Sequence, residues 1–129
     1  HLSIRRQRQM CIREGNGINT KALLDQAYST YFTTKGNDTT TVIEFTLPTA
    51  KVVDVLSVQE NISVGQRVEK FVLEYKDGAE WKQLAEGSTI GYKRLLRFAP
   101  ITAKVVRLRI LSSRLNPTLS SFGLYKLPE

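Results

Sequence analysis

A run of polar side chains between residues 57 and 68 is the part of the sequence best suited to binding. The stretch reads SVQENISVGQRV, and its hydrogen-bonding side chains are Gln59, Glu60, Asn61, Gln66 and Arg67. Amides, a carboxylate and a guanidinium donate and accept many hydrogen bonds, but they do not include the paired nucleophile and base that covalent catalysis needs. The chemistry they indicate is recognition of polar groups, on a ligand or on a neighbouring protein surface.

Two aliphatic residues, Ile62 and Val64, interrupt this polar run. They favour a packing role, with both side chains pressed against the core or an adjoining domain while the polar residues hydrogen-bond across the contact. Arg67 should then pair with a carboxylate, because an unpaired guanidinium away from water is costly, and Glu60 is the nearest candidate in the sequence. Contact with a ligand is the alternative interpretation of the same stretch.

Residues for nucleophilic or zinc chemistry are few. His1 is the only histidine and Cys11 the only cysteine. A lone cysteine forms no internal disulfide and has no partners at zinc spacing, so we interpret Cys11 as a small apolar residue in or near a strand. The sequence therefore predicts no nucleophile–histidine pair and no catalytic residues in this chain.

The net charge of +7 and the pI near 9.8 make nucleic acid or an anionic surface a partner to consider. Part of the excess lies near the N-terminal end, in Arg5, Arg6 and Arg8, and part in Arg107 and Arg109, which alternate with apolar residues. No sustained basic run is interleaved with stacking aromatics, so we expect no nucleic-acid partner. No apolar run approaches the roughly 20 residues of a membrane helix, and we expect no membrane span.

Alternation with a period of two predicts the strands that position these side chains. The first two runs cover residues 41–47 and 71–75, with inward-facing Ile43, Phe45, Leu47, Phe71, Leu73 and Tyr75. Further runs cover residues 80–87, 92–98, 105–111 and 120–127. Seven or eight short strands without long helices favour an all-β fold, an antiparallel β-sandwich, over a parallel α/β sheet.

Turn signals separate these runs. The Asp77-Gly78 dipeptide predicts a tight hairpin, and Trp81 on its return strand is expected in the core. One helical turn is predicted in residues 19–26, where Leu23 and Leu24 would be buried. Three prolines are expected at or beyond strand ends, where no hydrogen bond of the ladder is lost: Pro48, Pro100 and Pro117.

The segments QENISVGQRV, GSTIGYKR and FGLY, in this order, resemble the C-terminal β-sandwich of family 29 α-L-fucosidases. That module is in turn similar to the discoidin, or coagulation factor C-type, galactose-binding-like fold. The resemblance extends from about Ala22 to Lys126 and implies an eight-stranded jelly roll. We therefore expect a single β-sandwich domain over residues 1–129, with an N-terminal strand or linker region at 1–18 and a discoidin-like core at 19–127.

The resemblance implies a non-catalytic accessory module of an α-L-fucosidase, a glycoside hydrolase whose catalytic barrel lies outside this chain. The implied partners are that catalytic domain and fucosylated or galactose-containing glycans, and the implied location is periplasmic or secreted, although no signal peptide is visible. A free-standing discoidin-type lectin or adhesion module is the alternative. A basic module that binds nucleic acid or an anionic surface is the second alternative.

Discoidin-like sugar-binding modules often hold a structural calcium ion in a loop that corresponds to DQAYST, residues 25–30. Asp25 and Thr30 match that loop, whereas Gln26, Ala27 and Ser29 depart from it, and Ser121 stands where the last strand supplies a glutamate. Calcium prefers six to eight hard oxygen ligands. We expect no cofactor, with Asp25 and Thr30 as candidates for a weak calcium site.

Aromatic rings that stack on a pyranose are the other sign of sugar binding. Tyr28 and Tyr92 lie in or beside predicted loops and, with Lys93, complete the candidate ligand-binding or interdomain set, whereas Phe32 is expected to pack in the core. In galactose-binding relatives the connection before a corresponding strand supplies an arginine and an amide to the sugar, and here Glu60, Gln66 and Arg67 take those positions. Glu60 replaces the first arginine.

Hydrolysis of a sugar by this chain alone is not indicated. Glycosidases place two carboxyl groups about 5 Å apart or further, with one acting as an acid. We interpret the carboxylates Glu44, Glu74, Asp77, Glu80 and Glu86 as solvated groups on strands and turns.

Overall fold

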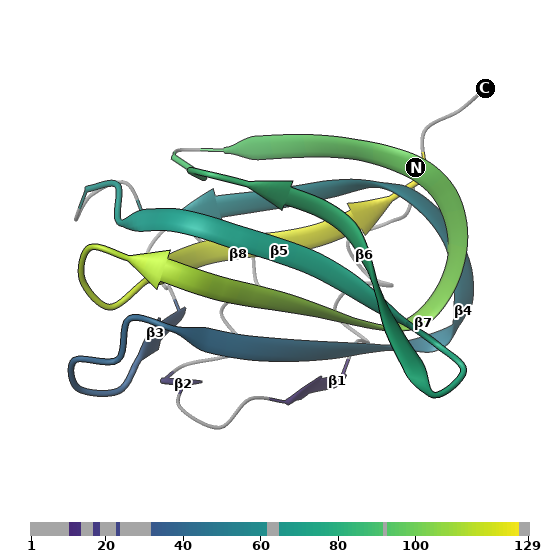
Figure 1. Cartoon of the computed structure of the whole chain (residues 1–129), viewed down its shortest axis with the longest axis horizontal. Coiled ribbons are helices and arrows are strands. Elements are labelled where there is room, and N and C mark those ends of the chain that lie inside the picture. Colours follow the sequence, from purple (N-terminus) through teal and green to yellow (C-terminus); the bar gives the residue numbers. More distant parts are fainter. Residues whose placement is uncertain are drawn as a thin grey trace.

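The computed structural model describes residues 11–13, 17–18, 23, 32–61, 65–91 and 93–126. Its strands are β1 (Cys11–Arg13), β2 (Gly17–Ile18), β3 (Phe32–Thr34), β4 (Thr41–Glu60), β5 (Val68–Asp77), β6 (Glu80–Gly87), β7 (Arg94–Ser113) and β8 (Thr118–Tyr125). All strand pairs are antiparallel, which confirms the predicted all-β class (Figure 1). Among the described residues, no helix has the length and hydropathy needed to cross a membrane.

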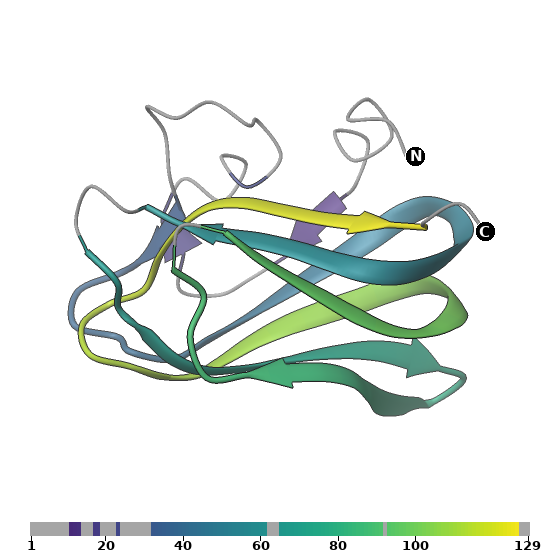
Figure 2. The same ribbon diagram turned by 90° about the horizontal axis from the view of Figure 1, so that it is seen from above.

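Two 20-residue strands, β4 and β7, form the frame of the sandwich. The first half of β4 and the second half of β7 lie in one layer with β1, β5 and β6, and their other halves lie in the second layer with β3 and β8. Figure 2 shows both strands turning at the same end of the molecule as they pass between the layers. The two layers are therefore joined by continuous chain as well as by side-chain packing.

The bends explain the positions of two prolines. We expected Pro48 and Pro100 at or beyond strand ends, but they lie inside β4 and β7. The ladder between these strands is interrupted from Thr46 to Lys51 and again after Val53, and both prolines fall in these gaps. Proline removes no ladder hydrogen bond at such irregular positions. The predicted position of these prolines at strand ends was therefore wrong, but the two prolines do avoid the paired positions of the ladder.

The core lies between the layers and uses the inward-facing sets predicted from the alternation. Ile43, Phe45 and Leu47 are buried, as is the expected core residue Phe32. The rings of Phe45 and Phe122 stack across the layers with centroids 3.8 Å apart. Leu23, from the predicted helical turn, is also fully buried, whereas Leu24 lies outside the described residues.

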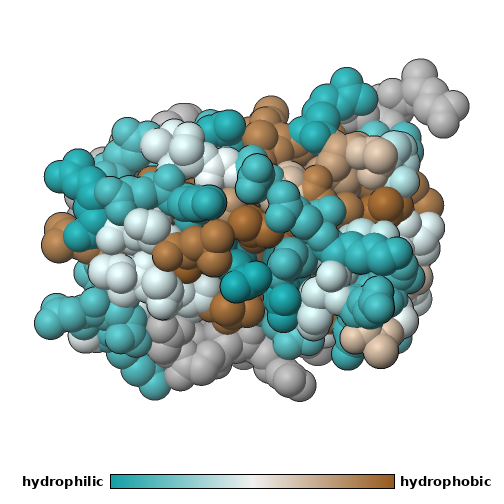
Figure 3. Space-filling model, viewed as in Figure 1, coloured by the Kyte–Doolittle hydropathy of each residue, from teal (hydrophilic) through white to brown (hydrophobic). Residues whose placement is uncertain are grey.

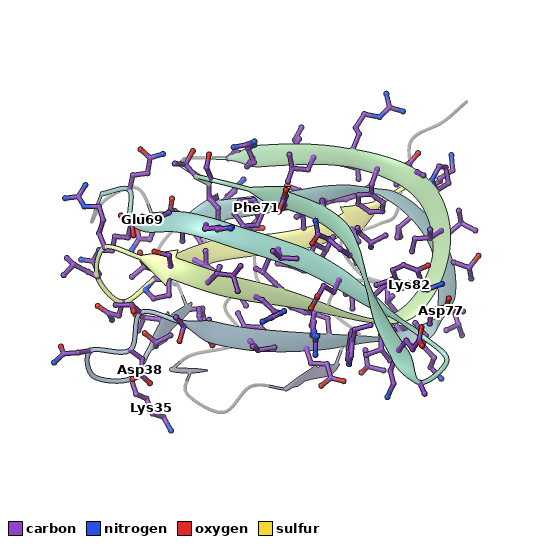
Figure 4. All side chains as sticks on the ribbon, in the orientation of Figure 1. Lys35, Asp38, Glu69, Phe71, Asp77 and Lys82 are labelled. Atoms are coloured by element: carbon purple, nitrogen blue, oxygen red, sulfur yellow. The ribbon has the colours of Figure 1, made fainter. Side chains whose placement is uncertain are left out.

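The β5–β6 hairpin is confirmed, with Asp77 opposite Glu80 and a two-residue turn at Gly78 and Ala79. Gly78 has a φ of 64°, a conformation that favours glycine. Lys82 donates to Asp77 across the turn at 2.7 Å, and this hydrogen bond together with the charge of Asp77 raises the pKa of Lys82. Figure 4 shows the pair at the tip of the hairpin.

At the other end of the hairpin, Gly87 lies opposite Phe71. A Cβ atom at Gly87 would lie 2.6 Å from Cε1 and Cζ of the Phe71 ring, which is fully buried. We expect Gly87→Ala to lower the free energy of unfolding by about 1 to 3 kcal/mol, because the ring has to shift inside a packed core. Urea unfolding measures this loss, and Ala85→Gly in the same strand provides a comparison without a new clash. An unchanged midpoint for Gly87→Ala would show that the ring moves freely.

Candidate functional site

The predicted polar stretch spans the end of β4 and the start of β5, and its centre is Glu60, which is 2% exposed. Glu60 Oε1 accepts hydrogen bonds from the backbone N–H groups of Arg67 at 2.8 Å and Val68 at 2.9 Å. Its Oε2 accepts one from the N–H of Gly91 at 2.8 Å. Both carboxylate oxygens are therefore occupied within the domain.

The backbone of Glu60 extends the same network. Its N–H donates to the carbonyl of Gly91 at 3.0 Å, and its carbonyl accepts from Ser120 Oγ at 3.3 Å. The N–H of Asn61 donates to the carbonyl of Thr118 at 3.0 Å. These bonds join the end of β4 and the starts of β5 and β8 to the connection between β6 and β7, at the left-hand end of the molecule in Figure 1.

Gly91 is the residue that brings the β6–β7 connection to Glu60. Its φ of 69° lies in the left-handed region, which side chains disfavour. A Cβ atom there would lie 3.2 Å from Nε2 of Gln66, so the amide of Gln66 packs against this glycine. The exchange of hydrogen bonds between Gly91 and Glu60 thus depends on a conformation that glycine adopts most readily.

The expected ion pair between the side chains of Arg67 and Glu60 is wrong. Glu60 binds the backbone N–H of Arg67, whereas Nη1 of the guanidinium donates to the carbonyl of Asn116 at 3.1 Å and to its Oδ1 at 3.3 Å. Asn116 Nδ2 in turn donates to Thr33 Oγ1 at 2.8 Å. The guanidinium is therefore held through Nη1 by two oxygens of Asn116 in the β7–β8 connection, whereas its Nε is buried without a hydrogen-bond partner. Asn116 is 49 residues from Arg67 in the sequence, so proximity along the chain could not identify it as the partner.

The remaining predicted residues of this end differ in exposure. Gln59 and Asn61 are half-buried, whereas Gln66 and Lys93 are exposed. Tyr28, Tyr92, Ile62 and Val64 lie outside the described residues, as do the calcium candidates Asp25 and Thr30. Within the described ranges, no group of three His, Cys, Asp or Glu side chains could hold a metal ion.

Trp81 was expected in the core, but it is half-buried and lies outside the core cluster. The guanidinium of Arg107 lies 4.1 Å from the centroid of its ring, and Arg107 Nε binds Glu74 Oε1 at 2.6 Å. Arg109 Nη1 reaches the other oxygen of Glu74 at 3.5 Å. Because a cation covers one face of the indole and Glu74 is only 12% exposed, this cluster is a satisfied structural network.

An open groove of about 430 Å³ lies beside the starts of β5 and β7 and the end of β6. Its lining consists of Glu69, Lys70, Glu86, Gly87, Ser88 and Arg94. Glu86 was expected to be a solvated charge, and the other five residues belong to no predicted site. Only the pairing of β5 with β6 and the path of the chain into β7 bring these residues together, so no local pattern could have identified them.

The fold is a jelly-roll β-sandwich. The connections at the end that contains Glu60 are fixed by hydrogen bonds that involve side chains. Residues 5–122 match the F5/8 type C domain family. The chain belongs to that family, also called the discoidin family, and the resemblance recognised in the sequence is confirmed.

The relatives of this chain include fucosidases. Alpha-L-fucosidase 1 of Arabidopsis thaliana is 31% identical over 115 residues, which are 87% of this chain. A GH29 fucosidase of Ruminococcus gnavus, solved in complex with fucose, is 27% identical with a TM-score of 0.85 over 96% of this chain and 27% of its own. The chain spans only 20% and 23% of the length of the two curated plant relatives that it matches.

The fold also occurs in separate sugar-binding modules. The family 32 carbohydrate-binding module of C. perfringens NanJ, solved in complex with galactose, has a TM-score of 0.80 over 94% of this chain and 96% of its own. Its sequence identity is 14%, so the likeness establishes a shared fold.

Proposed function

We propose that this chain is a non-catalytic accessory module of an α-L-fucosidase, which packs on the catalytic domain and binds carbohydrate. The observation that carries the proposal is its identity to a segment of fucosidases that makes up a quarter or less of the plant enzymes. A segment of that size leaves most of the enzyme, including a catalytic domain, elsewhere. The carboxylates Glu60 and Glu74, which are bound within the module, support a structural role for the acids of this chain.

Carbohydrate is the proposed ligand because modules of this fold include one solved with galactose. The galactose site of that module is not proposed for this chain. The resemblance places Glu60 at the position of an arginine in galactose-binding modules, and here it is committed to three backbone N–H groups. Arg67 is committed to Asn116. Glu60 and Arg67 therefore act first as supports of the end connections, and Gln66 beside them is exposed.

The test compares this module with its full-length parent on a glycan array. We expect the isolated module to bind fucosylated or galactose-containing glycans and to release no nitrophenol from a nitrophenyl α-L-fucoside. The parent enzyme should bind the same glycans and should release nitrophenol. Neutral-sugar binding should change little with salt, because it involves no counterion release.

Two outcomes would contradict this proposal. Nitrophenol release by the module that stops when one of its carboxylates is changed would make it an enzyme. Binding only to anionic probes, with a steep fall as salt rises, would instead support the basic-surface alternative.

A further inference from the structure

The groove beside β5, β6 and β7 differs from the end network in one respect: several of its polar side chains are uncommitted. No ion pair within the described residues joins Glu69, Lys70, Glu86 or Arg94 to one another. Glu69 Oε1 accepts from Ser112 Oγ at 2.7 Å, which orients the carboxylate and leaves its second oxygen without an assigned hydrogen bond. Arg94 Nη1 donates to the carbonyl of Thr89 at 2.9 Å, which orients the guanidinium and leaves further N–H groups.

One part of the groove, at Gly87, is fixed by the core beneath it. Gly87 lines the groove, and the fully buried ring of Phe71 packs so closely that no Cβ fits at this position. Figure 4 places Glu69 and Phe71 near one another on β5, with Glu69 closer to the end of the molecule. The backbone at Gly87 is therefore a fixed part of the groove lining, which lowers the entropic cost of binding at that point.

The charge of the lining points to a ligand without net charge. Glu69 and Glu86 contribute two negative charges, and Lys70 and Arg94 contribute two positive charges, so a simple anion or cation meets repulsion as well as attraction. Carboxylates accept hydrogen bonds from hydroxyl groups, and ammonium and guanidinium groups donate to hydroxyl and ring oxygens. The volume of about 430 Å³ lies within the usual range of about 300 to 1,000 Å³ for small-molecule sites.

We infer that this groove is a carbohydrate-contact site for a neutral sugar unit, separate from the end network around Glu60. This inference rests on the proposed sugar-binding function and names where on the module the sugar lies. An open groove suits a sugar unit inside a longer oligosaccharide, because the sugar units on both sides of it can extend into solvent. A free zwitterion has matching charges too, but exposed charge pairs contribute little in water, so charge alone would not hold it.

The experiment titrates the isotope-labelled module with lactose and fucosyllactose and follows its backbone amide resonances. We expect saturable shifts at Lys70, Gly87, Ser88 and Arg94. Glu86→Gln and Arg94→Gln should each weaken binding by about tenfold, since each removes a charged hydrogen-bonding group. Glutamine, used as a zwitterionic probe, should not compete.

Matched controls lie on the same strands. Glu80→Gln lies at the other end of β6 and Arg97→Gln lies further along β7, and both side chains are exposed outside the groove. These two variants should bind as the wild type does. Thermal unfolding of all four variants checks that Arg94→Gln keeps its fold, and Arg94→Lys should retain part of the binding.

The outcomes separate this inference from the function on which it rests. Sugar-dependent shifts confined to residues such as Gln66 and Lys93, with unchanged affinity in Glu86→Gln and Arg94→Gln, would overturn the groove and leave the module a sugar binder. Shifts with glutamine that equal those with the sugars would show a zwitterion site instead. A module that binds no glycan on the array and shows no shifts would overturn this inference and the carbohydrate-binding part of the proposed function.

Discussion

We expect Glu60→Ala to lower the free energy of unfolding by about 3 to 5 kcal/mol. The carboxylate accepts from the N–H groups of Arg67, Val68 and Gly91, and all three lose their acceptor together. A buried or partly buried donor left unsatisfied costs about 1 to 3 kcal/mol. Because a small domain has about 5 to 15 kcal/mol of stability in total, this one substitution should remove a large part of it.

Urea unfolding of Glu60→Ala, Glu60→Gln and Glu80→Ala measures this effect. Glu60→Gln keeps the volume and one acceptor oxygen, but its NH₂ group faces an N–H donor, so it should lose about 1 to 3 kcal/mol. Glu80 is exposed at the start of β6, and its substitution should change stability by less than about 0.5 kcal/mol. If Glu60→Ala unfolds within about 1 kcal/mol of the wild type, water replaces the carboxylate and Glu60 is not the support of this end.

The second large effect is expected for Phe122→Ala, with a loss of about 3 to 5 kcal/mol. Phe122 on β8 is fully buried and stacks on Phe45 of β4 with an interplanar angle of 3°. A face-to-face sandwich is not the electrostatically preferred arrangement of two rings, and centroids 3.8 Å apart leave little offset. Most of the loss should therefore come from lost burial and from the cavity left between the layers.

The matching control for Phe122→Ala is Leu95→Ala, since Leu95 is 59% exposed and its truncation leaves no cavity. Denaturant unfolding should show a lower midpoint for Phe122→Ala at nearly unchanged slope, and almost no change for Leu95→Ala. A loss below about 1 kcal/mol for Phe122→Ala would mean that neighbouring side chains collapse into the space.

Much of the fold could be predicted from local pattern. The alternation at residues 41–47 and 105–111 identified buried faces, because one buried face gives a period of two in any antiparallel sheet. The hairpin at Gly78 followed from turn chemistry. The continuity of β4 and β7 through their bends could not be predicted, because prolines such as Pro48 and Pro100 normally end a strand. Tertiary packing, which no local pattern reveals, keeps both strands extended beyond these prolines.

The site was less predictable, because its contacts join distant segments. Glu60 and Arg67 were singled out as polar residues of one connection, yet each also has a hydrogen-bond partner in a distant segment. Arg67 binds Asn116, and Glu60 binds Gly91, which is 31 residues further along the chain. Trp81 was assigned to the core from its apolar character, but a large ring can also pack against a guanidinium on an outer face.

Apolar groups on the visible face are small and separated by hydrophilic ones, as Figure 3 shows. The large apolar residues exposed among the described residues are Val42, Val52, Leu95 and Leu115. Stable partners commonly bury an apolar centre surrounded by a polar rim. Contact with a catalytic domain through this face would therefore depend mainly on polar complementarity.

The bends of β4 and β7 also affect how the domain opens. Each strand belongs to both layers, so hydrogen bonds in one layer hold the same continuous chain as those in the other. Separating the layers requires these two strands to leave their partners on both sides, and neither layer can open alone as an independent foldon. Local opening should then be confined to segments that only one layer holds, such as the β5–β6 hairpin, while the ladder-paired amides of β4 and β7 should exchange with solvent only when the whole domain unfolds.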